Sequence, residues 1–558
     1  SRLDFREGRL SIDVDDRGAS YPLTVDPLFQ AARLTASDAQ QNDELGYSVS
    51  VSAETVVVGA PFANANAGAT ADAGAAYVFV MGAGGWANMT QTAKLTASDG
   101  EAFDFFGFAV AIDGDTIVVG ALDDDLGGGS NQGSAYVFVR PAAGWVDATE
   151  SAKLTASDAA GSDEFGCAVS VSRDVIVVGS RFADNGAPGN QGAAYVFVRP
   201  GGGWTTTSET AKLSATDGTS SDLLGAAVAV DRDTIIAGAP GKDGTAANEG
   251  AAYVFEEPGG GWVNMTQTAK LTALVPGSLD ELGISVALDG NVAVAGAWGA
   301  DVGGNVSQGA AYVYERPGGG WANATETAQL TASDGGVADF FGVSVATGGD
   351  AVIVGSYQND VGASSSQGSA YLFVAPAAGW VSATETEKLL ASDGAAGDEF
   401  GRAVAIGEGV AVAGSHLFSS SNTGAAYVFD IPIATSFFTL TPCRVVDTRG
   451  PDGPLGGPAL AAGADREFTL VGACGIPDTA LAVSVNLAVT GASALGNLRL
   501  HPGGSAVPLV STINYGAGQT RSNNAIVRLN DEGALAAYVG QASGTVHLVL
   551  DVNGYFQP

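Results

Sequence analysis

Basic side chains are scarce in this chain of 558 residues. It carries 24 Lys and Arg against 60 Asp and Glu, a formal net charge of −36 at pH 7, although only 15% of its residues are charged. Nucleic acids and anionic lipid surfaces attract proteins chiefly through Lys and Arg. We therefore expect neither as a partner. A solvated acidic surface and cation binding both remain open.

Long apolar runs are also missing. No stretch of 18 or more apolar residues occurs, so the sequence predicts no transmembrane helix and no insertion into a membrane. No signal peptide is recognised, and because Ser1 starts within strand-like sequence we expect a longer precursor.

Signatures of catalysis are few. Three histidines, His416, His501 and His547, are scattered without the spacing of a metal site. Neither a Gly-x-Ser-x-Gly elbow nor a phosphate-binding loop is present. We therefore expect a protein that is not an enzyme.

Cysteine is rare too, with three residues in the chain. Cys167 lies in a strand pattern and is expected to act as a small buried hydrophobe. Cys443 and Cys474 lie in short turn-like contexts, and we expect a disulfide between them. Such a bond would place the protein outside the cytosol, in the extracellular space or at the cell surface.

The chain does contain one sequence motif that is repeated seven times. The spacings between successive copies are 61, 59, 59, 58, 59 and 59 residues. A fixed period of this kind indicates a repeat architecture, in which each unit buries its apolar face against the next. The copies begin near Ala32, Ala93, Ala152, Ala211, Ala269, Ala328 and Glu387.

Each copy predicts four short antiparallel strands. In the second copy these are residues 108–112, 116–120, 134–140 and 152–156, which are rich in Val, Ile, Phe and Tyr and separated by Gly, Asp and Asn. No helical period competes with them. Four strands repeated seven times predict a seven-bladed β-propeller over residues 32–430.

The last unit stops after three strands. We expect residues 32–37, which have a fourth-strand sequence, to complete its blade and close the ring, because closure removes exposed sheet edges. Six Gly-Trp pairs recur, and each Trp is expected to fill a gap between blades. They contain Trp86, Trp145, Trp204, Trp262, Trp321 and Trp380.

Outside the repeats the chain changes character. Residues 1–31 predict a hairpin, with strands at 10–14 and 21–25, and residues 431–436 predict a connector. Residues 437–558 hold eight short strand candidates, which together with the expected disulfide favour a β-sandwich. The candidates are residues 438–440, 444–447, 467–471, 480–489, 497–501, 525–529, 535–539 and 546–552. The expected fold class is therefore all-β, a seven-bladed propeller followed by a smaller sandwich domain.

One aspartate recurs in all seven copies, three residues before a Gly. We expect it to bond nearby backbone N–H groups and cap a turn. A second Asp opens the same loop in six copies, so paired carboxylates that hold a cation are the alternative. The recurring residues are Asp43, Asp104, Asp163, Asp222, Asp280, Asp339 and Asp398, and the second set is Asp38, Asp99, Asp158, Asp217, Asp334 and Asp393.

Another acid recurs five residues after the Gly of the second strand, in long polar loops. These loops are candidates for a weak Ca²⁺ site, with a solvated loop as the alternative. The candidate ligands are Asp123, Asp124, Asp125, Asp184, Asp243, Asp301 and Asp360. No other cofactor is expected.

The repeated Phe-Gly or Leu-Gly pairs, followed by strands such as Val57-Val58-Gly59-Ala60-Pro61, resemble the FG-GAP repeat family, to which the integrin α-subunit propeller belongs. This resemblance implies a seven-bladed propeller with an extracellular recognition or adhesion role. Integrin blades often carry a calcium loop between their first two strands. Here that junction is a short turn such as Asp113-Gly114-Asp115, so the integrin calcium site does not carry over. The C-terminal region resembles a domain typical of secreted bacterial proteins.

Three functions remain open. The first is recognition or adhesion through loops on one face, with a protein or glycan ligand. The second is a structural subunit of an extracellular filament or surface layer, in which the partner is another copy of the chain. The third is a carbohydrate-active enzyme that works across two carboxylates.

Overall fold

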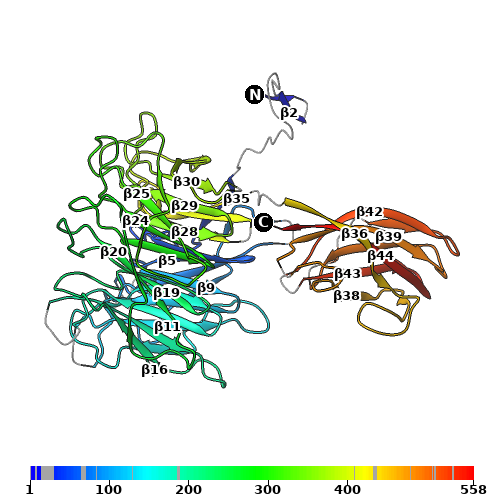
Figure 1. Cartoon of the computed structure of the whole chain (residues 1–558), viewed down its shortest axis with the longest axis horizontal. Coiled ribbons are helices and arrows are strands. Elements are labelled where there is room, and N and C mark those ends of the chain that lie inside the picture. The colour runs from blue at the N-terminus through cyan, green and yellow to red at the C-terminus, as the bar shows by residue number, and fades with distance from the viewer. Residues whose placement is uncertain are drawn as a thin grey trace. The chain divides into compact units, whose positions relative to one another are not determined.

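The computed structural model describes residues 2–6, 9–13, 30–64, 71–82, 85–127, 130–184, 189–376, 378–407, 409–431, 436–477, 479–504, 507, 511–530 and 533–557. Every regular element among them is a β-strand, so none of the described segments is a helix able to cross a bilayer. The chain divides into two compact units with a boundary between Pro432 and Ile433, within the connector expected from the sequence. In Figure 1 the strands of the first unit run from blue to yellow and those of the second from yellow to red.

The first unit is a seven-bladed propeller. The innermost strands are β4 (Ser48–Ser52), β9 (Ala109–Asp113), β13 (Phe165–Ser172), β18 (Ala227–Asp231), β23 (Ser285–Asp289), β28 (Ser344–Gly348) and β33 (Phe400–Gly407). Each contacts the innermost strand of the next blade, and β33 contacts β4, so the ring is closed. The predicted blade count is therefore confirmed.

The second strand follows the first through a short hairpin turn, and the third strand pairs antiparallel with the second across a longer loop. The second strands are β5 (Thr55–Ala60), β10 (Thr116–Ala121), β14 (Val175–Ser180), β19 (Thr234–Ala239), β24 (Val292–Ala297), β29 (Ala351–Ser356) and β34 (Val410–Ser415). The third strands are β6 (Ala75–Val80), β11 (Ser134–Val139), β15 (Ala193–Val198), β20 (Ala251–Glu256), β25 (Ala310–Glu315), β30 (Ser369–Val374) and β35 (Ala425–Asp430).

The fourth strands of blades 1 to 6 are β8 (Ala93–Leu95), β12 (Ala152–Thr155), β17 (Ala211–Ser214), β22 (Ala269–Thr272), β27 (Ala328–Thr331) and β32 (Glu387–Leu389). Blade 7 takes its fourth strand from the other end of the chain, because β3 (Gln30–Thr35) pairs antiparallel with β35. Its Leu34, opposite Ala426, is fully buried.

Five blades carry an extra two-residue strand, supplied by the following repeat and parallel to the fourth strand. These are β7 (Met89–Thr90), β16 (Thr207–Ser208), β21 (Met265–Thr266), β26 (Ala324–Thr325) and β31 (Ala383–Thr384). Neighbouring blades are therefore joined by main-chain hydrogen bonds at their outer edges.

The apolar cores of the propeller lie between neighbouring blades. Trp204, for example, packs in one cluster with Val118 of blade 2 and Val178 of blade 3. The equivalent Trp residues of later repeats are also buried, whereas Trp86 is half-buried. Each blade thus depends on its neighbours for its core, as the repeat period predicted.

The second unit is a β-sandwich. One sheet contains β36 (Ser436–Asp447), β44 (Thr545–Gln557), β39 (Ala482–Thr490) and β42 (Arg521–Arg528), with β37 (Leu460–Ala461) beside β44. The other contains β38 (Asp465–Thr469), β43 (Ala534–Gln541), β40 (Gly496–Pro502) and β41 (Ile513–Tyr515). A shared core, which includes Leu487 and Val539, lies between them.

Two expectations about strands were wrong. The candidates at 438–440 and 444–447 form the single strand β36, whose pairing with β44 continues across a register shift. The N-terminal hairpin consists of β1 (Arg2–Arg6) and β2 (Arg9–Asp13). The strand expected at 10–14 therefore corresponds to β2, and it pairs with β1, which precedes it. The expected strand at 21–25 lies outside the described residues.

The second unit holds the expected disulfide between Cys443 and Cys474, whose Cα atoms lie 5.9 Å apart. The two cysteines are separated by 31 residues, so in the chain-entropy model the bond stabilises the fold by about 3–4 kcal/mol. We expect a variant with Cys443→Ser and Cys474→Ser to lose about that much free energy of unfolding in the transition of the C-terminal unit, measured by denaturant titration. Cys167→Ala, which changes the buried free cysteine of blade 3, should leave that transition unchanged.

Candidate binding site at the centre of the propeller

The recurrent aspartates lie in loops that lead into the innermost strands. In each loop one carboxylate oxygen accepts a hydrogen bond from the backbone N–H three residues earlier; Gln40 N, for example, donates to Asp43 Oδ2 over 2.7 Å. The other six distances are 2.6–2.8 Å, at Asp104, Asp163, Asp222, Asp280, Asp339 and Asp398. All seven residues are buried. In the structure these carboxylates cap the turns of their loops by accepting backbone hydrogen bonds.

The second aspartate of the loop bonds a Tyr and a Lys of its own blade. In blade 2 the Tyr136 hydroxyl donates to Asp99 over 3.0 Å, and the Lys153 ammonium lies 2.7 Å from its other oxygen. Burial acts to raise the pKa of Asp99, but Lys153 and Tyr136 hold it below its usual value. The same arrangement recurs at Asp38, Asp158, Asp217 and Asp334, and with Arg33 as the base at Asp393.

Blade 5 departs from this arrangement. Val275 stands where the other blades have the second Asp, and Gln329 stands where they have the base. Both members of the ion pair are therefore replaced together, and Val275 is 81% exposed.

The acids proposed as calcium ligands are used by their own loops. The Asp125 side chain accepts from the Asn131 N–H, six residues ahead, over 2.7 Å. Backbone N–H groups five or six residues ahead also donate to Asp184, Asp243, Asp301 and Asp360.

In the loop with three successive acids the side chains have different partners. Asp124 is buried and bonds Ser134, Tyr136 and Lys153, whereas Asp123 is half-buried. Across the residues that the structure describes, no three His, Cys, Asp or Glu side chains are grouped to hold a metal ion. Calcium binding by these loops stays a prediction.

A different set of residues gathers at the axis of the ring. The residue directly after the Gly of each Phe-Gly or Leu-Gly pair lies just before an innermost strand or near its start. Closure of the ring therefore brings these seven residues to one end of the axis. Flanking positions repeat closely, but these residues do not. They are Tyr47, Phe108, Cys167, Ala226, Ile284, Val343 and Arg402.

Arg402 and two tyrosines form the middle of this group. The guanidinium lies 4.8 Å from the ring centroid of Tyr47 and 5.8 Å from that of Tyr357, and it donates to the Tyr47 hydroxyl over 3.2 Å. No described carboxylate forms an ion pair with it. A cation over aromatic faces is stabilised by their quadrupoles and remains able to meet a ligand.

Further aromatic rings pack against Tyr47 and against Tyr357. Tyr47 packs against Phe108 with ring centroids 5.0 Å apart, and against Phe62 at 6.0 Å. Tyr357 stacks on Phe340, which in turn packs against Trp298. These half-buried rings come from blades 1, 2, 5 and 6.

Two glutamates and a histidine complete the group. The Glu399 carboxylate accepts from Gln358 over 2.6 Å and lies 3.4 Å from His416 Nε2. Burial lowers the pKa of His416 to about 3, with Arg402 adding to the shift, so the imidazole is neutral. Its Nδ1 is buried and has no hydrogen-bond partner among the residues that the structure describes. We call Glu44, Tyr47, Tyr357, Glu399, Arg402 and His416 the central cluster.

Glu44 has the strongest titration shift among these acids. Burial, followed by repulsion from Glu399, raises its pKa to about 7. Glutamates at the same position in other blades have donors: Arg181 for Glu164 and Trp298 for Glu281. Among the described residues no donor lies within hydrogen-bond distance of the Glu44 carboxylate. A half-buried carboxyl with a raised pKa is typical of a functional site.

The shift of Glu44 leads to a prediction about pH. A carboxyl whose pKa is raised on folding destabilises the protein as pH increases from its unfolded value of 4.5 towards 7. We expect Glu44→Gln to flatten the decrease in melting temperature over this range and to melt higher than the parent at pH 8. Glu54→Gln, at an exposed hairpin turn of blade 1, is the control and should leave the profile unchanged. A parallel profile for Glu44→Gln would contradict the assignment.

The recurrent features of the sequence did not indicate this cluster, because the acids that recur in every repeat cap turns. The central cluster instead includes a position at which the seven copies carry seven different residues, with Arg402 where other copies have Tyr47 or Ala226.

Comparison with protein families matches the description "FG-GAP repeat" seven times, at residues 28–79, 89–138, 148–197, 207–255, 265–314, 324–373 and 383–429. These matches cover more than half of the chain. The chain belongs to the FG-GAP repeat family. The comparison with curated proteins found no match to this FG-GAP protein.

Similar solved structures are distant. A periplasmic gluconolactonase of Pseudomonas aeruginosa is 14% identical, with a TM-score of 0.36, over 66% of the FG-GAP protein and 86% of that chain. An exo-β-1,3-galactanase of Phanerochaete chrysosporium is 8% identical, with a TM-score of 0.27, over 72% and 98%. Neither likeness says anything about activity.

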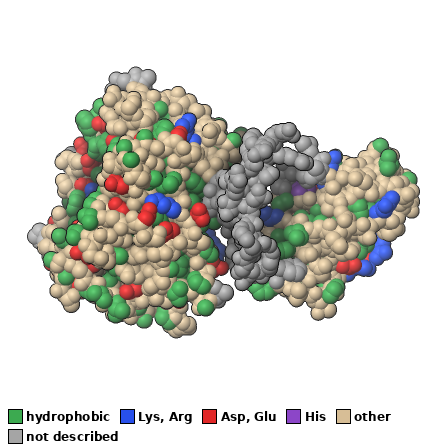
Figure 2. Space-filling model, turned by 90° about the horizontal axis from the view of Figure 1, so that it is seen from above, with side chains coloured by type: hydrophobic (Ala, Val, Ile, Leu, Met, Phe, Trp, Pro, Cys, Tyr) green, Lys and Arg blue, Asp and Glu red, His purple; other side chains and the backbone are tan. Residues whose placement is uncertain are grey.

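Charge is distributed unevenly along the chain. Residues 32–430 hold 46 acidic and 14 basic residues, a net charge of −32, whereas residues 437–558 hold eight acidic and six basic residues, a net charge of −2. On the face of the propeller in Figure 2, acidic side chains are scattered and basic ones are few. Arg402 is therefore a rare positive group within an acidic unit.

Proposed function

We propose that this chain is a non-catalytic recognition protein of the extracellular space or cell surface, and that it binds a protein or glycan ligand through the central cluster. The proposal rests on the positions at which the seven repeats carry different side chains. Seven nearly equivalent units place their unlike side chains together at one end of the axis, and a rigid ring of this kind presents them without the cost of ordering loops.

The chemistry of the cluster favours binding. Tyr47 and Tyr357 offer rings, Arg402 offers donors, and Glu44 and His416 Nδ1 offer polar groups that have no partner among the described residues. A ligand that combines an apolar face with hydroxyl or amide groups satisfies all of these. Aromatic residues and Arg are also the residue types that supply most binding energy at protein interfaces.

The disulfide of the sandwich supports an extracellular setting. Disulfides persist in oxidising compartments and are rare in the cytosol. Nucleic acid remains an unsuitable partner for a propeller with a net charge of −32.

The test is a binding screen with a matched pair of variants. Arrays of glycans and of extracellular proteins are probed with the full chain, and hits are measured by surface plasmon resonance. We expect Arg402→Ala to weaken binding at least about tenfold, because a hydrogen bond from a charged group to a ligand contributes about 1.5–3 kcal/mol. Arg173→Ala is the control, since Arg173 is exposed in the hairpin turn at the other end of an innermost strand.

Two results would overturn the proposal. One is a specific ligand whose affinity is the same for the parent and for Arg402→Ala. The other is turnover in a broad glycosidase and lactonase screen that Glu44→Gln or Glu399→Gln abolishes, because groups with shifted pKa values also occur in active sites.

A further inference from the structure

The residue two positions before each motif Gly alternates between an acidic and an apolar side chain around the ring. Blades 1, 3, 5 and 7 carry Glu at this position, whereas blades 2, 4 and 6 carry Phe or Leu. Because seven is an odd number, the alternation cannot close, and Glu399 of blade 7 and Glu44 of blade 1 belong to neighbouring blades. The seven residues are Glu44, Phe105, Glu164, Leu223, Glu281, Phe340 and Glu399.

Three of these four glutamates have a nitrogen partner in their own blade. In each case the partner is the residue directly after the second strand, so a partner at this position is the rule in the other blades that carry the glutamate. The pairs, with their N···O distances, are Arg181 with Glu164 (2.7 Å), Trp298 with Glu281 (2.7 Å) and His416 with Glu399 (3.4 Å).

Blade 1 has the glutamate without the partner. Pro61 follows its second strand, and a proline side chain cannot donate a hydrogen bond. Glu44 is half-buried and has no donor within hydrogen-bond distance among the residues that the structure describes. Water can satisfy this carboxylate in the free protein, and a ligand that carries a donor can replace the water.

The partner that blade 1 lacks is a donor and not necessarily a charge. The indole N–H of Trp298 is neutral, and His416 is neutral because burial lowers its pKa to about 3. The charges near Glu44 disfavour an ion as well. Arg402 repels a cationic group, whereas Glu399 and the propeller, with its net charge of −32, repel an anionic one. A neutral donor therefore fits this place best.

A hydroxyl group matches both polar sides of the central cluster. It has one O–H donor and two lone pairs, so it can donate to Glu44 and accept from Arg402, whereas an amide has its donor and its acceptor on different atoms. A sugar ring carries several hydroxyls beside apolar C–H faces, which can pack against half-buried rings such as Tyr47 and Tyr357. A neutral glycan thus provides all the contacts that the cluster offers.

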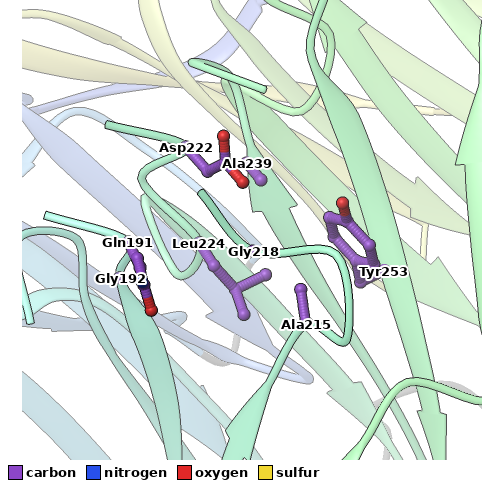
Figure 3. Close-up of a pocket in the computed structure, with 8 residues that line it drawn as sticks. All are labelled: Gln191, Gly192, Ala215, Gly218, Asp222, Leu224, Ala239 and Tyr253. Atoms are coloured by element: carbon purple, nitrogen blue, oxygen red, sulfur yellow. The ribbon is translucent and has the colours of Figure 1, made fainter. Parts of the chain in front are cut away.

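Two other spaces in the propeller suit a sugar less well. The cavity between blades 3 and 4, lined by residues that include Asp222, Leu224 and Tyr253, has a volume of about 10 Å³, which is room for one water (Figure 3). An open hollow of about 380 Å³ lies at the outer edge of blade 4, beside Lys270 and Thr325. The described residues that line this hollow include no aromatic ring and no acid.

We propose that Glu44 receives its missing hydrogen bond from a hydroxyl group of a neutral glycan, and that a hydroxyl of the same sugar accepts from Arg402. This binding mode rests on the proposed function and narrows its ligand from a protein or glycan to a neutral glycan. Glu44 selects for a donor because the equivalent glutamates of blades 3, 5 and 7 already have partners within the protein.

The ligand class is tested with the full chain on an array of oligosaccharides. Gluco-, manno-, xylo- and galacto-oligosaccharides are the neutral probes, and oligomers of alginate and of chitosan are the anionic and cationic ones. We expect binding to a neutral probe, measured by isothermal titration calorimetry. Its affinity should change less than about twofold between low and high salt, because screening does not act on an uncharged ligand.

Pro61→Arg imports the blade 3 arrangement and places a guanidinium beside Glu44. We expect it to weaken binding of the neutral oligosaccharide at least about tenfold, because the protein itself then occupies the carboxylate. Pro240→Arg is the matched control, since Pro240 is a buried proline at the same position of blade 4, where Leu223 replaces the glutamate. It should leave the affinity unchanged, and so should Thr325→Ala at the outer hollow.

The two proline variants also have a readout that needs no ligand. An arginine beside Glu44 favours its charged form, so the pKa of Glu44, which burial above all raises to about 7, should decrease. We therefore expect Pro61→Arg to flatten the decrease in melting temperature between pH 4.5 and 7, and Pro240→Arg to keep it. The other charged groups that act on Glu44 are the same in both variants: Glu399, Arg402 and Asp72.

The outcomes separate this binding mode from the proposed function. A protein ligand that depends on Arg402, with no neutral glycan bound, overturns the binding mode and leaves the proposed function standing. Neutral-glycan binding that Pro61→Arg does not weaken, or that Thr325→Ala does, also overturns it. An unchanged pH profile for Pro61→Arg contradicts the equivalence of Pro61 and Arg181 on which it depends. A ligand whose affinity ignores Arg402→Ala overturns the proposed function itself.

Discussion

Deletion of residues 1–35 is expected to prevent the propeller from folding. This deletion removes β3, the fourth strand of blade 7, and leaves the N–H and C=O groups on one edge of β35 without partners. It also removes Leu34 and Ala32 from the core that joins blades 7 and 1. We expect no cooperative melting transition for the first unit by circular dichroism, and aggregates by size-exclusion chromatography, since open strand edges associate.

A shorter deletion separates ring closure from any other effect of the N-terminus. Residues 1–13 include only β1 and β2, which pair with each other and with no blade. Their removal should leave the propeller transition unchanged. Leu34→Ala keeps the strand and should destabilise the propeller by about 2–5 kcal/mol. A monomeric, cooperatively folded product from the longer deletion would contradict closure by β3.

Replacement of Gly107 by Ala is expected to destabilise the propeller strongly. Gly107 has a φ of 96°, where L-residues are strained, and an added Cβ would lie 2.3 Å from the carbonyl oxygen of Ala75. That oxygen belongs to the main chain of the neighbouring blade, so two blades would have to move apart. We expect a loss of more than about 3 kcal/mol in the free energy of unfolding, measured by urea titration.

Gly114 provides the matched control for this substitution. It also has a positive φ, 53°, but nothing lies within 4 Å of an added Cβ. Gly114→Ala should therefore cost only about 1 kcal/mol, which reflects the backbone strain alone. Equal losses at the two positions would show that backbone strain, and not contact between blades, dominates at the repeated Phe-Gly pair.

The structure explains why the residues of the repeated motif recur. The motif Gly approaches the main chain of the preceding blade, the first acid caps the turn before it, and the second acid ties the loop to a Tyr and a base. All three features maintain the spacing between blades. This explains why the most regular residues of the sequence are structural.

Much of the fold could be predicted because its information is local. In blade 2 the expected strands at 108–112 and 116–120 correspond to β9 and β10 within one residue, since alternating apolar residues and a Gly turn determine a hairpin without help from distant segments. The N-terminal hairpin was misplaced because several strand-like segments compete there and no repeat fixes the register. The β41 strand was missed because its three residues are too short to show a period.

The sequence by itself determined the number of blades and the strand pattern of each, and it favoured turn capping for the first recurrent acid, because these features follow from contacts within a unit or with the next one. Only the tertiary structure showed which residues come together in the central cluster. Glu44 lies 313 positions before Tyr357 and 358 before Arg402, Tyr357 and Arg402 come from neighbouring repeats, and no local pattern relates the three. They become neighbours because closure of the ring brings the loops at the same end of different blades to one axis.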